Sequence, residues 1–326
     1  MGEGDIIKEK LIVVVGPTAV GKTEISVEVA AHLDGEIISA DSMQVYREMN
    51  IGTAKIKQEE MISLSRKRIP HHLIDILNPD EDFSVADFQL LVRNLISDIN
   101  LKGKTPLLVG GTGLYINSII DPYNFTEQEA NLELRNKLYK EAEQWGNYYL
   151  YNKLLKVDPE TARKFHPNDL RRIVRSLETF YQTGKTISSI QKEHNNQSVY
   201  DLVMIGLFYE RDILYQRINQ RVDKMIEAGL IEEVYQLLKK GYSPHLKSMQ
   251  GLGYRQIAAY LTGVLTKEEA IYLLKRDTRH FAKRQFTWFK RDRRIKWFNV
   301  NDFFKKSLCV EKITEYIGRT MGNSVE

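Results

Sequence analysis

Residues 16–23 of this 326-residue chain form a complete phosphate-binding loop of the pattern G-x-x-x-x-G-K-[ST]. A β-branched apolar run precedes the loop at 11–15, and apolar residues recur at helical spacing through 24–33. A strand, a glycine-rich turn and a helix N-terminus in this order direct backbone N–H groups at an anion. The unit predicts a site for a di- or triphosphate, with Lys22 adding charge and Thr23 ligating Mg²⁺. Its residues are Gly16, Pro17, Thr18, Ala19, Val20, Gly21, Lys22 and Thr23.

The composition is typical of a cytoplasmic enzyme. Charged residues make up 28% of the chain and hydrophobic residues 42%, and no run of eighteen apolar residues occurs. We therefore expect no membrane span and no signal peptide. The single cysteine, Cys309, excludes an intramolecular disulfide and a cysteine-cluster zinc site. The net charge of +4 permits a polyanionic partner without requiring one.

Alternating strand and helix patterns predict an α/β fold, a P-loop NTPase-like parallel sheet flanked by helices. The predicted strands are 11–15, 36–40, 106–109 and 202–207, with an edge-strand candidate at 295–300. Helical patterns cover 23–33, 84–101 and much of 211–291. Residues 122–198 are polar and helical without a convincing strand. The expected domains are therefore an α/β core of 1–121 and 199–326, with a C-terminal helical segment, and an inserted all-helical domain at 122–198.

Asp41 and its neighbours follow the second predicted strand directly. In open α/β sheets, ligands bind at the carboxyl ends of the strands, and the phosphate loop opens at the same edge. The pattern therefore favours an Asp41 side chain that faces the phosphate site. The alternative is that Asp41 or Ser42 merely caps a following helix.

A carboxylate that many nucleotide hydrolases use is missing. ATPases and GTPases usually carry an Asp at the end of a buried strand, where it holds Mg²⁺. The strand at 106–109 ends instead in Gly110-Gly111-Thr112-Gly113. These glycines either let another group approach the backbone closely or form a tight turn. The loop is therefore open to a pyrophosphate group that belongs to something other than a nucleotide.

Basic residues are concentrated near the C-terminus. Nine of the twenty residues from 275 to 294 are Lys or Arg, interleaved with aromatic residues. A second basic run, Arg171-Arg172-Ile173-Val174-Arg175, lies in the predicted helical insertion. Either patch alone is compatible with a solvated helix face. Together with the phosphate loop, they favour a nucleic acid held across a cleft.

Six segments occur in the order in which they are found in one known family. They are 16–23, 39–46, 51–55, 70–75, 109–115 and 283–289. In these motifs the chain resembles the tRNA dimethylallyltransferases, also called tRNA isopentenyltransferases, from about residue 10 to 300. The tail has no cysteine–histidine zinc finger, as in the bacterial form. Two departures are Met43, at a variable position, and Lys290, where the family often has Arg.

The resemblance implies a reaction. Dimethylallyl diphosphate would donate its five-carbon group to N6 of the adenosine 3′ of a tRNA anticodon, at position 37, releasing pyrophosphate. Asp41 would accept a proton from N6, Lys22 and Mg²⁺ on Thr23 would neutralise the leaving group, and Thr18 would bond its bridging oxygen. The implied partners are the tRNA anticodon stem-loop and the diphosphate, and the enzyme is expected to be a cytoplasmic monomer.

The resemblance also implies a set of tRNA contacts, carried over position by position. They fall on Asp41, Ser42, Met43, Gln44, Thr112, Arg135, Arg171, Arg172, Ile173, Val174, Arg175, Gln250, Gly251, Leu252, Gly253, Tyr254, Arg255, Lys283, Arg284, Gln285, Phe286, Thr287, Trp288, Phe289 and Lys290.

Two other functions share some of these features. A nucleotide or small-molecule kinase has the same loop but needs no basic surface in two zones. A nucleic-acid-dependent ATPase explains the loop and the charge but needs the missing strand-end carboxylate. His71 and His72 resemble a metal pair, but without a third ligand they are interpreted as a helix-start or cleft-lining pair.

Overall fold

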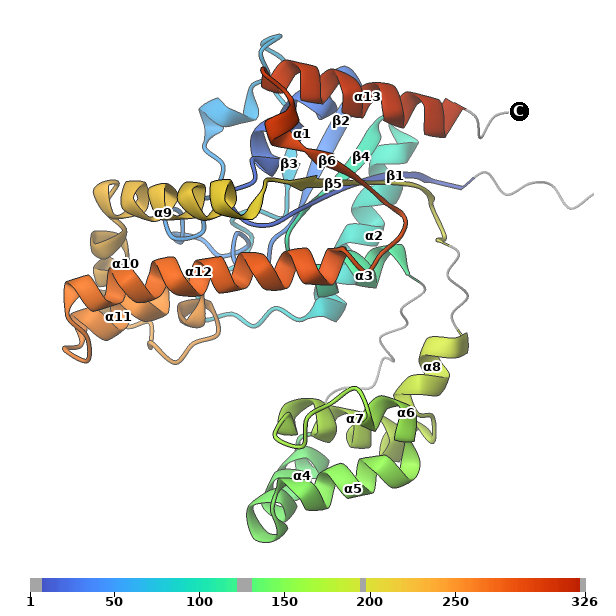
Figure 1. The fold of residues 1–326 in the computed structure, drawn as a ribbon, viewed down its shortest axis with the longest axis vertical. Coiled ribbons are helices and arrows are strands. Elements are labelled where there is room, and N and C mark those ends of the chain that lie inside the picture. Colours follow the sequence, from blue (N-terminus) through green and yellow to red (C-terminus); the bar gives the residue numbers. More distant parts are fainter. Residues whose placement is uncertain (1–7, 122–130, 194–197, 323–326) are drawn as a thin grey trace, which may run out of the picture. The chain divides into compact units, whose positions relative to one another are not determined.

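The structure is a computed structural model that describes residues 8–121, 131–193 and 198–322. The chain divides into two compact units (Figure 1). One unit consists of residues 1–120 and 198–326, and the other of residues 121–197. Each unit is described separately below.

The first unit is built on a six-stranded sheet in the order β3-β2-β4-β1-β5-β6, in which every pair is parallel. This confirms the predicted fold class. The sheet includes a short strand, β3, that the sequence patterns did not predict. The strands are β1 (Lys10–Val15), β2 (Gly35–Ala40), β3 (His71–His72), β4 (Thr105–Gly110), β5 (Asp201–Phe208) and β6 (Ile295–Asn299).

Helices cover both faces of the sheet, because successive strand residues point to opposite sides and both sets are apolar. On one face, Val14 and its equivalents pack against α1 (Lys22–His32) and α13 (Lys306–Gly322). On the other face, Val13 and its equivalents pack against α2 (Val85–Leu101) and α3 (Gly113–Ile120). Figure 1 shows α13 on the outer side of α1.

Four further helices of this unit pack around a separate apolar core. They are α9 (Arg211–Glu227), α10 (Leu230–Lys239), α11 (Tyr254–Leu261) and α12 (Lys267–Phe289). Val45, Tyr46 and Met49, from the segment after β2, complete this core. The core therefore fixes the segment that carries Asp41 against the C-terminal helices. Short 3₁₀ helices lie at Gln58–Met61, Ser248–Gln250 and Val300–Asp302.

The second unit is helical throughout its described residues. Its helices are α4 (Leu132–Trp145), α5 (Asn147–Val157), α6 (Pro159–Ala162), α7 (Leu170–Thr183) and α8 (Ile187–Glu193). Leu150, Leu154, Ile173 and Leu177 are fully buried in its own core. A set of small helices with a private core can hold its shape without the sheet.

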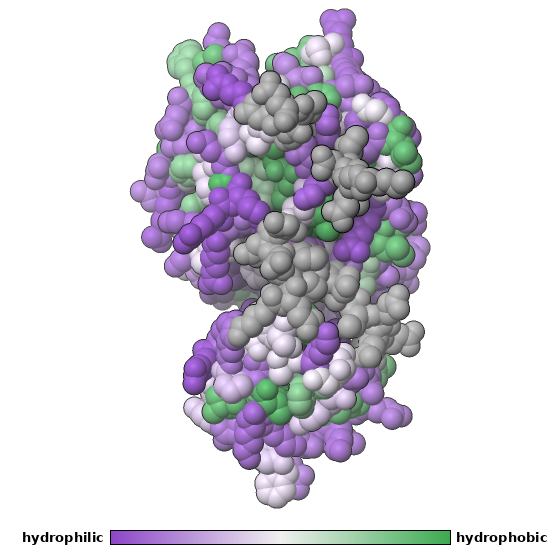
Figure 2. Space-filling model, turned by 90° about the vertical axis from the view of Figure 1, so that its right-hand side faces the viewer, coloured by the Kyte–Doolittle hydropathy of each residue, from purple (hydrophilic) through white to green (hydrophobic). Residues whose placement is uncertain are grey.

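The visible surface is mostly hydrophilic, with hydrophobic residues in small groups (Figure 2). Among the helices that the structure describes, none combines the length and the apolar character that a membrane crossing requires.

Candidate active site

The phosphate loop connects the central strand β1 to the N-terminus of α1. The Nζ atom of Lys22 donates to the carbonyl oxygens of Gly16 and Pro17, at 2.8 and 3.0 Å. The lysine therefore lies along the loop, with its positive charge where the loop would hold an anion. Arg217 on α9 donates from Nε to the carbonyl of Ala19 at 3.0 Å, so a second element supports the loop.

Burial lowers the pKa of Lys22 from its usual 10.5 to about 8. The nearby positive charge of Arg221, on α9, acts in the same direction, while the negative charge of Asp41 opposes it. Arg221 is partly buried, and desolvation lowers its pKa. Two cations that share a partly buried space beside one carboxylate leave a surplus of positive charge, which a diphosphate would neutralise.

Asp41 follows β2, and its position relative to the loop is set by strand register. Ala40 of β2 and Val15 of β1 both pair with Gly110 of β4, so the two strands end at the same level. Asp41 Oδ1 accepts the N–H of Met43 at 2.9 Å, a local turn that orients the carboxylate. The sheet thus carries Asp41 to the edge where the phosphate loop opens.

A small cavity of about 60 Å³ lies at this edge. Lys22, Thr23, Asp41 and Gln44 contribute its polar lining. The rest of the lining is mixed, and its apolar residues are Ile37, Ile56, Ile74 and Val109. The cavity therefore joins phosphate-binding groups, a carboxylate and an apolar wall in one space.

The donor set of this cavity suits Mg²⁺, because the Thr23 hydroxyl and the Asp41 carboxylate are hard oxygen ligands. Mg²⁺ commonly takes only one or two protein ligands and completes its shell with water and substrate phosphates. Among the described residues, no group of three or more His, Cys, Asp or Glu side chains could hold a metal by itself. A magnesium ion here would therefore depend on the phosphate ligand.

His71 also lines the small cavity, from strand β3. Its Nδ1 lies 2.8 Å from the carbonyl oxygen of Ile69, and burial lowers its pKa, so the neutral form with Nδ1 protonated is favoured. His72 points elsewhere and pairs with the buried Glu36, at 2.8 Å. The two histidines therefore do not converge as a metal pair.

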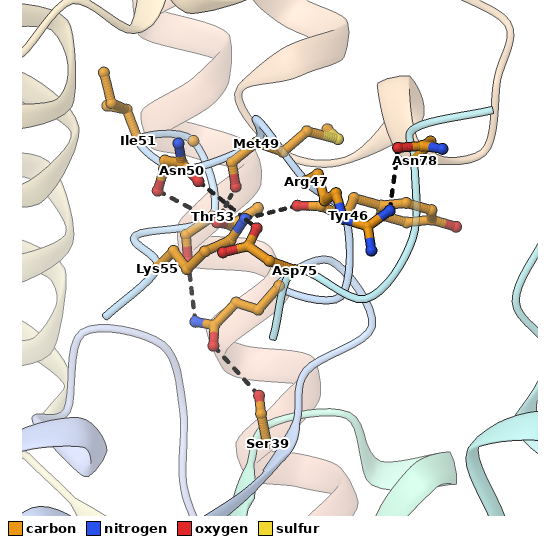
Figure 3. A network of polar contacts seen from close by, with 12 residues as sticks. Ser39, Tyr46, Arg47, Met49, Asn50, Ile51, Thr53, Lys55, Asp75 and Asn78 are labelled. Carbon is orange, nitrogen blue, oxygen red and sulfur yellow. Dashed lines mark hydrogen bonds and ion pairs between the residues drawn. The ribbon is translucent and has the colours of Figure 1, made fainter. Parts of the chain in front are cut away.

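A polar network fixes the segment that follows Asp41 (Figure 3). The Nζ atom of Lys55, which is 8% exposed, donates to Tyr46 O, Asn50 Oδ1 and Asp75 Oδ1. Gln44 accepts a bond from the Ser39 hydroxyl and donates to a backbone carbonyl, which places its amide at the cavity.

Glu233 on α10 holds the same segment from the other side. Its carboxylate accepts the backbone N–H groups of Asn50, Ile51 and Gly52, at 3.0, 2.8 and 3.2 Å. The Tyr254 hydroxyl donates to it at 2.7 Å. Four donors on one carboxylate make a rigid support for the loop beside the site.

A larger cavity of about 1060 Å³ opens beside α1. Its lining includes Thr23 of the loop together with Arg217, Arg221 and Lys224 of α9. These α9 residues belong to none of the motifs in the sequence. The available signal was the spacing of Arg217 and Arg221, which lie one helical turn apart and so share a face.

Besides 41–44, two predicted tRNA-contact segments lie on the first unit, and their residues differ in exposure. In the segment 250–255, Gln250 and Arg255 are exposed, whereas Tyr254 is fully buried. Arg255 pairs with Asp277 at 2.7 Å. The role of this segment in RNA binding stays a prediction, and burial restricts it to the exposed side chains.

Exposed and buried side chains also alternate in the segment 283–290 of α12. Lys283, Arg284, Thr287 and Lys290 are exposed, whereas Gln285 and Phe289 are 6% and 2% exposed. The helix therefore presents its basic side chains to solvent and anchors itself through the other face.

Trp288 is partly exposed on α12 and also packs against the segment after β4. Its side chain is 44% exposed, and its Nε1 donates to Asn117 Oδ1 at 3.1 Å. A Cβ atom added at Gly113 would come within 2.4 Å of the indole, so this glycine makes room for the ring. The glycine-rich segment after β4 is thus shaped by close approach of α12. Thr112 of that segment accepts the N–H of Ser42 at 3.4 Å.

The remaining predicted contacts lie on the second unit. Ile173 and Val174 are buried in its core, whereas Arg171, Arg172 and Arg175 are exposed. Arg135 and Arg175 both bond the fully buried Glu178, at 2.9 and 2.8 Å. These two arginines therefore also stabilise the unit that carries them.

The pKa of Lys22 leads to a test of anion binding. Below pH 8 the amine of the free protein is charged, and between about pH 8 and 10.5 it is largely neutral. A bound diphosphate favours the charged form, so at pH 8.5 pyrophosphate binding should take up a fraction of a proton through Lys22. The affinity of the protein for pyrophosphate should therefore fall as the pH rises above 8.

Isothermal titration calorimetry in buffers of different ionisation enthalpy measures this proton uptake. The matched variant is Lys22→Met, which should lack the Lys22 share at pH 8.5, and the two proteins should converge at pH 6.5. Equal uptake by both proteins at pH 8.5 would contradict a depressed pKa of Lys22.

These features define a class. A P-loop protein that binds phosphate groups has a central parallel strand, a glycine-rich loop and a loop lysine at the carboxyl edge of a helix-covered sheet, as this chain does.

Comparison with known proteins narrows the class. A family model described as IPP transferase matches residues 44–292. The chain is 55% identical to the tRNA dimethylallyltransferase of Halothermothrix orenii, over 89% of this chain and 88% of that one. It is 54% identical to the protein of that name from Carboxydothermus hydrogenoformans, over 95% and 97% of the two chains. The chain belongs to the IPP transferase family.

Solved structures of similar proteins lead to the same family. The tRNA isopentenylpyrophosphate transferase of Bacillus halodurans is 46% identical and covers 97% of this chain and 98% of its own, with a TM-score of 0.73. A eukaryotic dimethylallyltransferase, crystallised while acting on tRNA, is 32% identical with a TM-score of 0.77. That match covers 89% of this chain and 74% of the eukaryotic one.

Proposed function

We propose that this enzyme is a tRNA dimethylallyltransferase, which transfers a dimethylallyl group from dimethylallyl diphosphate to N6 of adenosine 37 of tRNA. The observation that carries the proposal is the shared lining of the small cavity, where Lys22 and Thr23 meet Asp41. A prenyl transfer to an amine needs a diphosphate site and a proton acceptor on either side of one carbon atom.

In this reaction the N6 nitrogen attacks C1 of the donor and forms a C–N bond while the C1–O bond breaks. The electron pair of that bond leaves on pyrophosphate, and the N6 proton passes to Asp41. Lys22, Arg221 and the loop N–H groups stabilise the negative charge that develops on the leaving oxygen, with Thr18 beside it. A magnesium ion on Thr23 would supply further charge neutralisation there.

The apolar side of the small cavity suits the hydrocarbon tail of the donor. Ile37, Ile56, Ile74 and Val109 offer no hydrogen-bonding partner, and the volume is about 60 Å³. A hydrocarbon chain beside these side chains would be removed from water without leaving a polar group unpaired. The apolar wall therefore supports a prenyl donor.

Ile74→Ala should make more room for the donor tail beside the apolar wall. The residue is only partly buried, so we expect the enlarged cavity to raise kcat/KM for a ten-carbon prenyl diphosphate about tenfold or more, because one misplaced methylene group changes specificity by about 10–200-fold. Competition between five- and ten-carbon donors measures the change. Leu90→Ala, at an exposed position on α2, is the control. An unchanged donor preference in Ile74→Ala would show that the donor tail does not lie against Ile74.

The acceptor must leave the stack of its anticodon loop to reach the cavity, which requires basic surface around the entrance. Lys283 and Arg284 are exposed on α12, and neither forms an ion pair with a described residue. They are the strongest candidates for phosphate contacts, whereas Arg276 and Arg279 already bond Asp277 and Asn219.

Replacing Lys283 and Arg284 together by Gln should weaken tRNA binding and flatten its dependence on salt. The log–log slope should fall by about 0.7 for each contact to a single-stranded phosphate. Preference among tRNAs should change little, since phosphate contacts position the RNA without specifying its sequence. A charge-matched control is Lys102→Gln with Lys305→Gln, two exposed lysines elsewhere. If the salt dependence of tRNA binding had the same slope in both double variants, Lys283 and Arg284 would not contact phosphates.

The function itself is tested with unmodified tRNA transcripts and labelled dimethylallyl diphosphate. We expect N6-dimethylallyladenosine at position 37, detected by mass spectrometry of digested tRNA, with a requirement for Mg²⁺. ATP in place of the donor should give no RNA-stimulated hydrolysis. Hydrolysis of ATP without prenyl transfer would favour a nucleic-acid-dependent ATPase, and phosphorylation of a small acceptor would favour a kinase. Cytoplasmic location and a monomeric state remain parts of the same proposal.

A further inference from the structure

Gln285 joins three segments that are far apart in the sequence. Its side-chain Oε1 accepts the backbone N–H of Thr18 at 2.8 Å, and its Nε2 donates to the carbonyl of Gly111 at 3.0 Å. An N–H can only donate and a carbonyl can only accept, so these two partners fix the orientation of the amide. One side chain of α12 thereby holds the phosphate loop and the segment after β4 together.

The fit around this side chain is close. Gln285 is 6% exposed, and a Cβ atom added at Gly111 would lie 2.1 Å from its Nε2. Only a glycine at position 111 lets the amide reach both partners. The side chain is therefore enclosed between backbone segments, on the side of α12 opposite to its exposed basic residues.

The bond to Thr18 completes the support of the loop. Arg217 of α9 donates to the carbonyl of the next residue, Ala19, at 3.0 Å, so the peptide groups before Thr18 and after Ala19 are held by two different helices. Without Gln285, the N–H of Thr18 would lose the one acceptor that it has among the described residues. A partly buried N–H without an acceptor is unfavourable, so the loop would shift or open to water.

We propose that Gln285 is a positioning residue, which holds the phosphate loop in its anion-binding conformation through Thr18, and not a residue that contacts RNA. The inference rests on the proposed function only for the identity of the anion. It changes the meaning of the motif Lys283-Arg284-Gln285, because two of its residues face solvent and the third acts on the opposite side of the helix.

The first test uses Gln285→Met, which keeps the length of the side chain and removes both hydrogen bonds. Without any RNA present, we expect its affinity for pyrophosphate to fall about tenfold, from the loss of one buried hydrogen bond. Lys283→Met should show the opposite pattern, with weaker tRNA binding and unchanged pyrophosphate affinity. Weaker tRNA binding by Gln285→Met with an unchanged affinity for pyrophosphate would overturn the proposal.

A second readout does not depend on the function. Hydrogen exchange of backbone amides in residues 16–23 should be faster in Gln285→Met than in the parent, while the strands keep their protection. If the parent bound no pyrophosphate, the proposed function would fail, and exchange would still decide the role of Gln285. Equal exchange in both proteins would overturn the positioning role.

A third variant separates positioning from general loss of stability. Gly111→Ala should displace the amide of Gln285, and so lower pyrophosphate affinity as Gln285→Met does. In a Gln285→Ala background, the same Gly111→Ala change should have little further effect, because the space is already vacant. Independent, additive losses from the two substitutions would show that they do not act through one contact, and would overturn the proposal.

Discussion

Asp41→Asn should fold normally and bind tRNA, yet lose prenyl transfer by a factor of roughly 10²–10⁴, the usual range for the loss of a general base. The amide keeps an oxygen in the place of Oδ1, so the turn that accepts the N–H of Met43 is preserved. What it removes is the ability to accept the N6 proton. Single-turnover transfer with saturating tRNA and donor measures the chemical step directly.

Asp41→Ala is the informative companion, because it removes the turn as well as the carboxylate. We expect it to add a loss of tRNA affinity to the loss of rate, since Ser42, Met43 and Gln44 would no longer be held by the turn. A turnover of Asp41→Asn within a few-fold of the parent would exclude Asp41 as the proton acceptor.

Lys22→Met should lower the rate of transfer by a factor of roughly 10²–10³, the range seen when one preorganised donor to a developing negative charge is removed. The lysine is enclosed by the loop and lies near Arg221, so water cannot replace its charge efficiently. Pyrophosphate affinity should fall as well, while tRNA affinity should remain close to that of the parent. Calorimetry with pyrophosphate and filter binding with tRNA separate the two.

Lys22→Arg provides the control for charge. It keeps the positive charge, but a guanidinium group cannot repeat the two bonds of a compact ammonium to Gly16 and Pro17. We therefore expect partial activity, above that of Lys22→Met. Loss of tRNA binding together with pyrophosphate binding in Lys22→Met would contradict the separation of the two sites.

The sheet could be predicted because strands buried on both faces form continuous apolar runs, as in Leu11-Ile12-Val13-Val14-Val15. The two-residue strand β3 escaped prediction, because His71 and His72 carry no apolar signal and owe their place to pairing with Ile37 and Ile38. No element was predicted for 301–326, where α13 covers α1.

Only part of the candidate site could be predicted from the sequence. Asp41 could be related to the phosphate loop from sequence, because both follow strands whose carboxyl ends share one edge. Gln285 could not, because its partner Thr18 is 267 residues away and no local pattern records the bond. Tyr254 likewise stands in a motif assigned to RNA, while its hydroxyl bonds the carboxylate of Glu233. A motif identifies a segment, but burial decides which side chains can face a ligand.

The strand order has a consequence for synthesis on the ribosome. Strand β1 is central because it pairs with β4 on one side and with β5 on the other, yet β5 begins at residue 201, after the whole helical unit. While residues 121–197 are being made, the nascent chain holds four of the six strands, and β1 is an unpaired, strongly apolar edge. Such edges recruit other chains. The helical unit therefore delays closure of the core, and until β5 is made the β1 edge is open to pairing with other chains.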